Sequence, residues 1–172
     1  MITLNGSLDS LSPANQRIPG VMESPILRPR ILLAEDHPEV LEALRFTLDE
    51  LGEVVGMVGD GQALVEMARQ LKPDLIITDI SMPRLNGLDA TRALLPFLPQ
   101  SKVIILTVHR EAVYLSLAFN AGARGYVLKR SAVAELPQAV LHVLGGDRYI
   151  GQGVGGREEW AAADGDEATT WR

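Results

Sequence analysis

Short apolar runs alternate with longer amphipathic stretches between residues 29 and 150. Five runs are rich in aliphatic and β-branched residues, which is typical of buried strands. They lie at 30–34, 53–58, 74–79, 102–107 and 125–129. Each is followed by a stretch with apolar residues at steps of three and four, which predicts a helix. The alternation predicts an α/β domain, a doubly wound five-stranded parallel sheet with helices on both faces.

Several of the predicted helices carry start signals. Pro38 stands at an early position of the first helix, where the missing N–H of proline has no partner to lose. Asp60 and Ser131 are predicted N-caps of the second and last helices, because their side-chain oxygens can accept orphan N–H groups. Pro137 lies near the start of the last helix and predicts an irregular first turn. The other predicted segments are a loop at 80–87 and helices at 88–98 and 111–121.

The two ends of the chain lack this pattern. Residues 1–28 contain three prolines and no periodic apolar positions, which predicts a flexible leader, with either Met1 or Met22 as the true start. Residues 151–172 hold five glycines and five acids, which predicts a disordered tail rather than an output domain. The alternative is a short docking peptide that uses Trp160 and Trp171.

Composition narrows the function classes. The chain has 172 residues, enough for one compact domain plus tails, with 16 basic and 22 acidic residues and a formal net charge of -6. This balance disfavours a generally basic nucleic-acid binder. The absence of cysteine excludes disulfides, thiolate catalysis and cysteine-ligated metal sites. No apolar stretch is long enough to span a membrane and no signal peptide is visible, so we expect a cytoplasmic protein.

Polar side chains stand where four of the predicted strands end. Glu35 and Asp36 follow the first strand, and Asp79 ends the third. Thr107 ends the fourth and Lys129 ends the fifth. Because ligand sites of open parallel sheets form at the carboxyl ends of the strands, we expect these residues to share one cleft.

Three carboxylates in one cleft repel one another, and a hard divalent cation relieves that repulsion. Magnesium fits an all-oxygen ligand set and bridges to phosphate oxygens. A carboxylate can also act as a nucleophile and form an acyl phosphate, with Thr107 and Lys129 beside the phosphoryl oxygens. Taken singly, each of these residues has a plain structural interpretation, such as a helix start, a turn cap or a surface charge. Their joint placement favours phosphoryl chemistry.

Two further stretches carry a family resemblance. The loop at 82–87 reads Met-Pro-Arg-Leu-Asn-Gly, and residues 121–129 read Ala-Gly-Ala-Arg-Gly-Tyr-Val-Leu-Lys. The strand-end residues Asp36, Asp79, Thr107 and Lys129 are separated by 43, 28 and 22 positions. These spacings and the two stretches together match the motifs of one protein family. Residues 29–150 resemble the receiver domain of two-component response regulators, closest to receivers that usually carry a LuxR-type helix-turn-helix output.

The resemblance implies that Asp79 is the phosphoacceptor. It also implies that Glu35, Asp36 and Asp79 bind Mg²⁺, with the backbone carbonyl of Ser81 as a further ligand. Glu35 stands where many relatives have aspartate, although glutamate also occurs there.

The same resemblance assigns the remaining residues. Thr107 and Lys129 would contact the phosphoryl group, and Thr107 with Tyr126 would form the switch pair, Tyr126 rotating inward as Thr107 is drawn to the phosphate. Ser81 and His109 would tune the lifetime of the phosphoryl group.

The resemblance therefore predicts a response regulator that is not an enzyme. It implies three kinds of partner: a sensor histidine kinase or phosphotransfer protein, a downstream protein target, and a second copy of the chain in a phosphorylation-dependent homodimer. Because only 22 residues follow Ile150, we expect a stand-alone receiver that does not contact DNA directly. The alternatives are an unphosphorylated pseudo-receiver and a transcription regulator that has lost its DNA-binding domain.

Enzyme classes with related chemistry fit less well. An aspartyl phosphatase of the haloacid dehalogenase type needs a second acid two residues after the nucleophile, where this chain has Ser81. A P-loop NTPase needs a glycine-rich motif that is absent. A flavodoxin-like FMN binder would meet an acidic loop after Ala34, which suits phosphate poorly without a metal.

Overall fold

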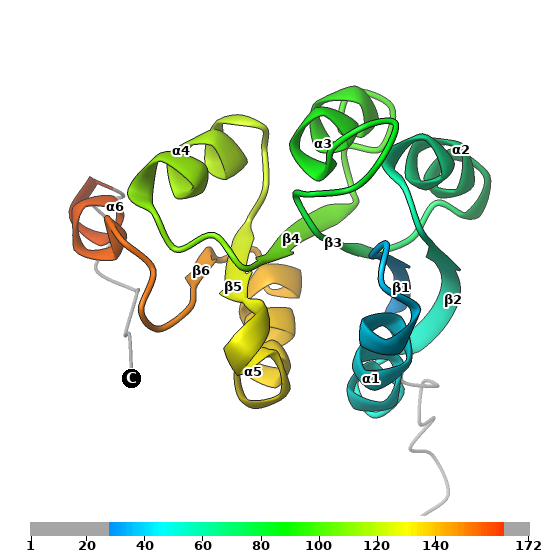
Figure 1. The fold of residues 1–172 in the computed structure, drawn as a ribbon, viewed down its shortest axis with the longest axis horizontal. Helices are drawn as coiled ribbons and strands as arrows, with labels where there is room; N and C mark the ends of the chain where they lie inside the picture. Colours follow the sequence, from blue (N-terminus) through cyan, green and yellow to red (C-terminus); the bar gives the residue numbers. More distant parts are fainter. Residues whose placement is uncertain (1–27, 164–172) are drawn as a thin grey trace, which may run out of the picture.

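The computed structural model describes residues 28–163, which form one sheet with helices on both faces (Figure 1). The sheet is parallel and its strand order is β2-β1-β3-β4-β5-β6. The strands are β1 Arg30–Ala34, β2 Glu53–Val58, β3 Leu75–Thr78, β4 Lys102–Thr107, β5 Gly125–Leu128 and β6 Tyr149–Ile150. The predicted α/β fold is confirmed, and the two-residue strand β6, which was not predicted, extends the sheet beyond β5.

Six α-helices surround this sheet in the described residues. They are α1 Pro38–Leu48, α2 Gly61–Leu71, α3 Gly87–Leu94, α4 Ala112–Asn120, α5 Ala132–Leu144 and α6 Arg157–Ala163, with a 3-10 helix η1 at Lys129–Ser131. Helices α1 and α5 cover one face, α2, α3 and α4 cover the other, and α6 lies beyond α4 at the β6 edge (Figure 1). Among residues 28–163, no helix is long and apolar enough to cross a membrane.

The middle strands carry apolar residues on both faces because both faces of the sheet are covered. Leu32 and Ile76 point into the core under α2, α3 and α4. Their neighbours Leu33 and Ile77 point into the core under α1 and α5. All four side chains are at most 1% exposed, so the continuous apolar runs of the sequence reflect two cores that share one sheet.

The two predicted N-caps have different outcomes. The Asp60 side chain accepts a hydrogen bond from Ala63 N–H at 2.9 Å and caps α2 as predicted. Ser131 occupies the N-cap position of α5 but does not cap it, because its hydroxyl donates instead to the Leu128 carbonyl at 3.2 Å. That bond lies across η1, which leads irregularly into α5, and Pro137 lies inside the helix.

The prediction of a disordered tail is wrong for residues 151–163. Val154 is buried in the core beneath α4. Helix α6 places the Trp160 ring 5.0 Å from the Phe119 ring in an edge-on contact. The pattern missed this segment because tertiary contacts such as this one, rather than an amphipathic stripe, hold the helix. The predicted leader and the remainder of the tail, Trp171 included, lie outside the described residues.

Candidate functional site

The carboxyl ends of β1, β3, β4 and β5 form one edge of the sheet. The order of the strands places β3 between β1 and β4, so Asp79 lies at the centre of that edge. The Asp79 N–H donates to the Ala34 carbonyl at 3.0 Å and fixes the end of β3 beside the end of β1. Thr107 ends β4 and pairs in the sheet with Leu128 of β5, the residue directly before Lys129.

Three charged side chains meet at this edge. The Lys129 ammonium lies 2.8 Å from Asp79 Oδ2 and 2.6 Å from Glu35 Oε2. Glu35 and Asp79 are 1% and 4% exposed and Lys129 is 17% exposed, so water screens these charges little. Burial by itself lowers the pKa of Lys129, but its close contacts with the Asp79 and Glu35 carboxylates outweigh burial, and the net pKa is raised. Lys129 therefore stays a cation.

The loop after β3 holds Asp79 from the other side. Asp79 Oδ1 accepts a hydrogen bond from the Ile80 N–H at 2.6 Å. The Gly87 N–H donates to the Ile80 carbonyl at 2.9 Å, and Asn86 caps α3 by accepting from Asp89 N–H. A Cβ atom on Gly87 would lie 1.8 Å from the Asp79 carbonyl oxygen, so only glycine fits where this loop returns to β3.

His37 joins the acidic residues after β1, a role that the sequence did not indicate. Its Nδ1 atom lies 2.8 Å from Glu35 Oε1 and 2.9 Å from Asp36 Oδ1. The hydrogen bond to Glu35 and the charge of Asp36 raise the pKa of His37. The adjacency of three polar residues after a strand was the available signal.

The donor set at this edge suits a hard cation. Ligand atoms of Glu35, Asp36 and His37 lie within 4.8 Å of one another. Glu35 Oε2 is buried and makes an ion pair with Lys129 but no hydrogen bond of good geometry, which leaves it able to accept another positive partner. Carboxylate oxygens are ligands that Mg²⁺ prefers. The cluster of acids therefore fits a magnesium ion, and the Asp79 carboxylate lies across the Lys129 ammonium from Glu35.

The predicted switch residues lie together behind the site. Thr107 is fully buried, and its Oγ1 accepts a hydrogen bond from the His109 N–H at 3.3 Å. Tyr126 is also fully buried and its hydroxyl donates to the His109 carbonyl at 2.8 Å. Burial raises the pKa of Tyr126 well above its usual value. The sequence predicted an inward rotation of Tyr126 on phosphorylation, whereas the structure has the ring inside already.

Ser81 and His109 lie at the mouth of the site. The Ser81 hydroxyl is 3.3 Å from His109 Nε2, across 28 residues of sequence. The His109 ring stacks on Tyr114 with ring centres 4.1 Å apart, which fixes the imidazole in place. The structure thus brings together the two residues predicted to tune the lifetime of a phosphoryl group.

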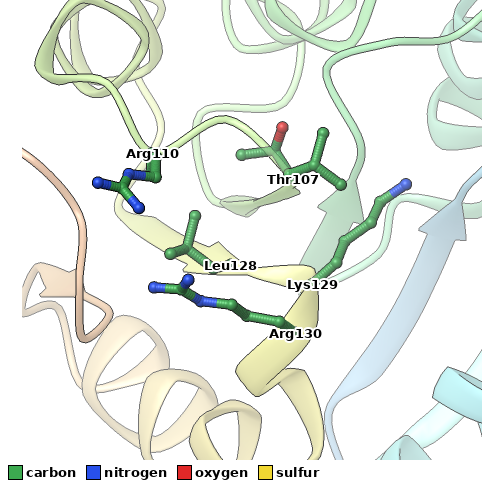
Figure 2. Close-up of a pocket in the computed structure, with 6 residues that line it drawn as sticks. Thr107, Arg110, Leu128, Lys129 and Arg130 are labelled. Atoms are coloured by element: carbon green, nitrogen blue, oxygen red, sulfur yellow. The ribbon is translucent and has the colours of Figure 1, made fainter.

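A pocket of about 190 Å³ lies next to the acidic site. Its lining residues are Thr107, Val108, Arg110, Leu128, Lys129 and Arg130. In Figure 2 the Lys129 ammonium points away from the Arg110 and Arg130 guanidinium groups, which lie near Leu128. Lys129 therefore belongs both to the acidic site and to the lining of this pocket.

Fold and site together define a receiver-type α/β domain with an acidic pocket around a buried aspartate. The model of the response regulator receiver domain family matches residues 31–141. The chain therefore belongs to the response regulator receiver domain family.

Curated relatives agree with this assignment. The transcriptional regulatory protein MctR of Rhizobium johnstonii is 38% identical over 127 residues, which are 73% of this chain and 59% of that protein. The response regulator GacA of Pseudomonas aeruginosa is 37% identical over 123 residues, 70% of this chain and 58% of that protein. The chain thus spans about three fifths of the length of these relatives.

Solved structures show the same fold. A LuxR-family two-component response regulator from Aurantimonas has a TM-score of 0.73 at 30% identity, covering 79% of this chain and 99% of that one. The isolated receiver domain of RcsB from Salmonella enterica, solved with the phosphomimetic BeF3⁻, has a TM-score of 0.68 at 29% identity, covering 74% and 96%. These similarities confirm the receiver fold and its likeness to receivers of LuxR-type regulators.

Proposed function

We propose that this chain accepts a phosphoryl group on Asp79 from a sensor histidine kinase or a phosphotransfer protein. The observation that supports this most is the shared ion pair, in which one ammonium contacts the buried Asp79 and Glu35 at 2.8 and 2.6 Å. A buried carboxylate beside a fixed cation is a nucleophile already placed where negative charge develops during transfer.

In the proposed transfer, an Asp79 oxygen bonds to phosphorus while the P–N bond to the donor histidine breaks. The imidazole leaves with that electron pair and takes up a proton, so the product is an acyl phosphate. Glu35, Asp36 and Asp79 would hold Mg²⁺, together with the Ser81 carbonyl. Held there, Mg²⁺ would neutralise charge on the phosphoryl oxygens. The Lys129 ammonium, which contacts Asp79, would add positive charge beside them, and the Thr107 hydroxyl would donate to a phosphoryl oxygen.

The switch would use the same hydroxyl. When Thr107 turns towards a phosphoryl oxygen, it releases the His109 N–H that it accepts at 3.3 Å. The loop between β4 and α4 then changes position, and Tyr126 follows through its hydrogen bond to the His109 carbonyl. A phosphoryl group shifts this equilibrium only through its different contacts with the two states.

The chain is proposed to act as a phosphoacceptor rather than an enzyme, with slow self-dephosphorylation at most. The Ser81–His109 pair would set the rate at which water reaches the acyl phosphate. A downstream protein and a second copy of the phosphorylated chain are the proposed binding partners.

Two of the similar proteins bear on the role of the whole protein. The relative MctR is named as a transcriptional regulatory protein, and one solved structure, with a TM-score of 0.68 and 30% identity, is titled as an RcsB–DNA complex. The expectations of a stand-alone receiver without direct DNA contact therefore stay predictions. An unphosphorylated pseudo-receiver is the second candidate, favoured by the Lys129 ammonium, which already pairs with Glu35 and Asp79.

Intact-mass measurement with Mg²⁺ and a small phosphodonor tests the proposal. The wild type should gain one phosphoryl group, and Asp79→Asn should gain none. Asp147→Asn is the matched control, because Asp147 is exposed on the loop after α5, and it should behave as wild type. If folded wild-type protein forms no adduct with several donors, the pseudo-receiver interpretation takes over.

A further inference from the structure

The segment at residues 149–163, here called the C-terminal segment, is anchored beside the switch tyrosine. Strand β6 pairs with β5, and the Gly151 N–H donates to the Tyr126 carbonyl at 2.8 Å. The buried Glu135 carboxylate accepts the Gln152 N–H at 3.0 Å and the Tyr149 hydroxyl at 3.1 Å. A buried carboxylate that accepts two donors from one segment fixes that segment to α5.

The same segment is fixed a second time on the other side of β5. The Gly155 N–H donates to the Arg110 carbonyl at 2.7 Å, in the loop that leads into α4. Trp160 packs edge-on against Phe119 of α4, and the Arg148 guanidinium lies 5.5 Å from the Trp160 ring. Phe119 is only 7% exposed, and the Trp160 ring of the C-terminal segment packs against it.

These contacts meet the proposed switch at adjacent residues. The His109 carbonyl accepts the Tyr126 hydroxyl, and the carbonyl of the next residue, Arg110, accepts the Gly155 N–H. Thr107 bonds the His109 N–H of the same loop. The loop therefore cannot move without straining either the tyrosine contact or the glycine contact.

We propose that the C-terminal segment is a coupled part of the switch: it holds the loop between β4 and α4 in the unphosphorylated arrangement and docks on α4 less tightly when Asp79 is phosphorylated. The phosphoryl part of this inference rests on the proposed function. Because coupling between two binding events is reciprocal, the docked segment then weakens binding of a phosphoryl mimic by the same factor. Allosteric coupling is typically about fivefold or more, which sets the size of the expected effect. A partner that uses the Phe119 side of α4 would have to displace Trp160.

The first experiment needs no phosphoryl chemistry. Hydrogen exchange at the Gly155 amide is measured in wild type and in Tyr126→Phe, which loses only the hydroxyl that binds the His109 carbonyl. Protection of the Gly155 amide should fall at least threefold. Glu159→Gln is the control, because Glu159 is an exposed residue of α6, and it should leave protection unchanged. Unchanged protection in Tyr126→Phe would overturn the coupling of loop and segment.

The second experiment adds beryllofluoride with Mg²⁺. The fluorescence of Trp160, isolated in a Trp171→Phe background, should become more accessible to quenching by acrylamide when beryllofluoride binds. Trp160→Ala, with an unchanged circular dichroism spectrum, should need at least fivefold less beryllofluoride for half-saturation, followed by fluorine NMR, while Glu159→Gln should match wild type. Equal saturation of Trp160→Ala and wild type would overturn the phosphoryl coupling.

The two arms separate the two proposals. If wild-type protein neither binds beryllofluoride nor forms an adduct, yet Tyr126→Phe loosens the Gly155 amide, the proposed function fails and the coupling of loop and segment stands. If wild type forms the adduct and both arms are flat, the function stands and the coupling fails.

Discussion

Lys129 is one of three lysines in the chain, and it contacts two carboxylates that water scarcely reaches. Replacing it by methionine keeps a side chain of similar length and removes the charge. Glu35 and Asp79 would then face each other without their shared ammonium, and breaking a buried ion pair costs about 3–5 kcal/mol. We discount this for the partial exposure of Lys129 and expect Lys129→Met to lower the free energy of unfolding by roughly 2–3 kcal/mol in urea titrations at neutral pH.

Two further variants make this prediction specific. Lys102→Met is the matched control, because no ion pair of the half-buried Lys102 side chain is present among residues 28–163, and it should cost well under 1 kcal/mol. Adding Asp79→Asn to Lys129→Met removes one of the unpaired charges and should restore part of the lost stability. Equal losses for Lys102→Met and Lys129→Met would mean that the ion pair contributes nothing net.

At the scale of elements, the start of α3 and the end of β3 touch through their backbones. A Cβ atom on Gly87 would lie 1.8 Å from the Asp79 carbonyl oxygen, so Gly87→Ala must push the loop away from Asp79. Overpacking of this kind costs about 1–3 kcal/mol, and here the displaced group is rigid backbone. We expect a loss of about 2 kcal/mol in urea titrations, with a lower phosphoryl yield by intact mass.

Gly59→Ala is the control for this pair of elements. The nearest atom to a Cβ on Gly59 is the Glu35 carbonyl oxygen at 4.0 Å, an ordinary contact, and Gly59 also lies in a loop at the carboxyl edge of the sheet. Its unfolding free energy should stay close to that of wild type. If both alanine variants lost the same stability, the cause would be chain entropy at glycine rather than the contact with Asp79.

The sequence predicted those helices and strands whose buried residues form a regular pattern along the chain. The middle strands can be predicted because the two cores require apolar residues on both faces of the sheet, and α2 can be predicted because Asp60 caps it. Helix α6 has seven residues and is held by the contact between Trp160 and Phe119, 41 positions apart, which no local period encodes. Strand β6 has two residues and depends on pairing with β5.

The candidate site follows the same division. The strand-end rule gathered Glu35, Asp79 and Lys129 because each directly follows a strand whose neighbours are set by topology. The orientation of the side chains could not be predicted from the sequence. The sequence did not reveal that His37 turns back onto Glu35, or that Tyr126 lies inside with its hydroxyl on the His109 carbonyl.

At the scale of the whole molecule, a metal that binds the folded chain and not the unfolded one stabilises the entire fold by mass action. The proposed Mg²⁺ site draws its ligands from β1 and β3, which approach one another only after folding. At a concentration 100 times its dissociation constant, Mg²⁺ should add about 2.7 kcal/mol to the free energy of unfolding. A chelator should reverse the gain in thermal unfolding experiments.

The effect of Mg²⁺ on variants distinguishes the proposed pocket from general ionic screening. Asp36→Asn removes one proposed ligand and should lose most of the gain, whereas Asp147→Asn, an exposed acid outside the pocket, should keep it. Lys129→Met should gain more than wild type, because the cation then stands in for the missing ammonium between Glu35 and Asp79. Equal gains in all four proteins, wild type included, would place the magnesium effect elsewhere on this acidic chain.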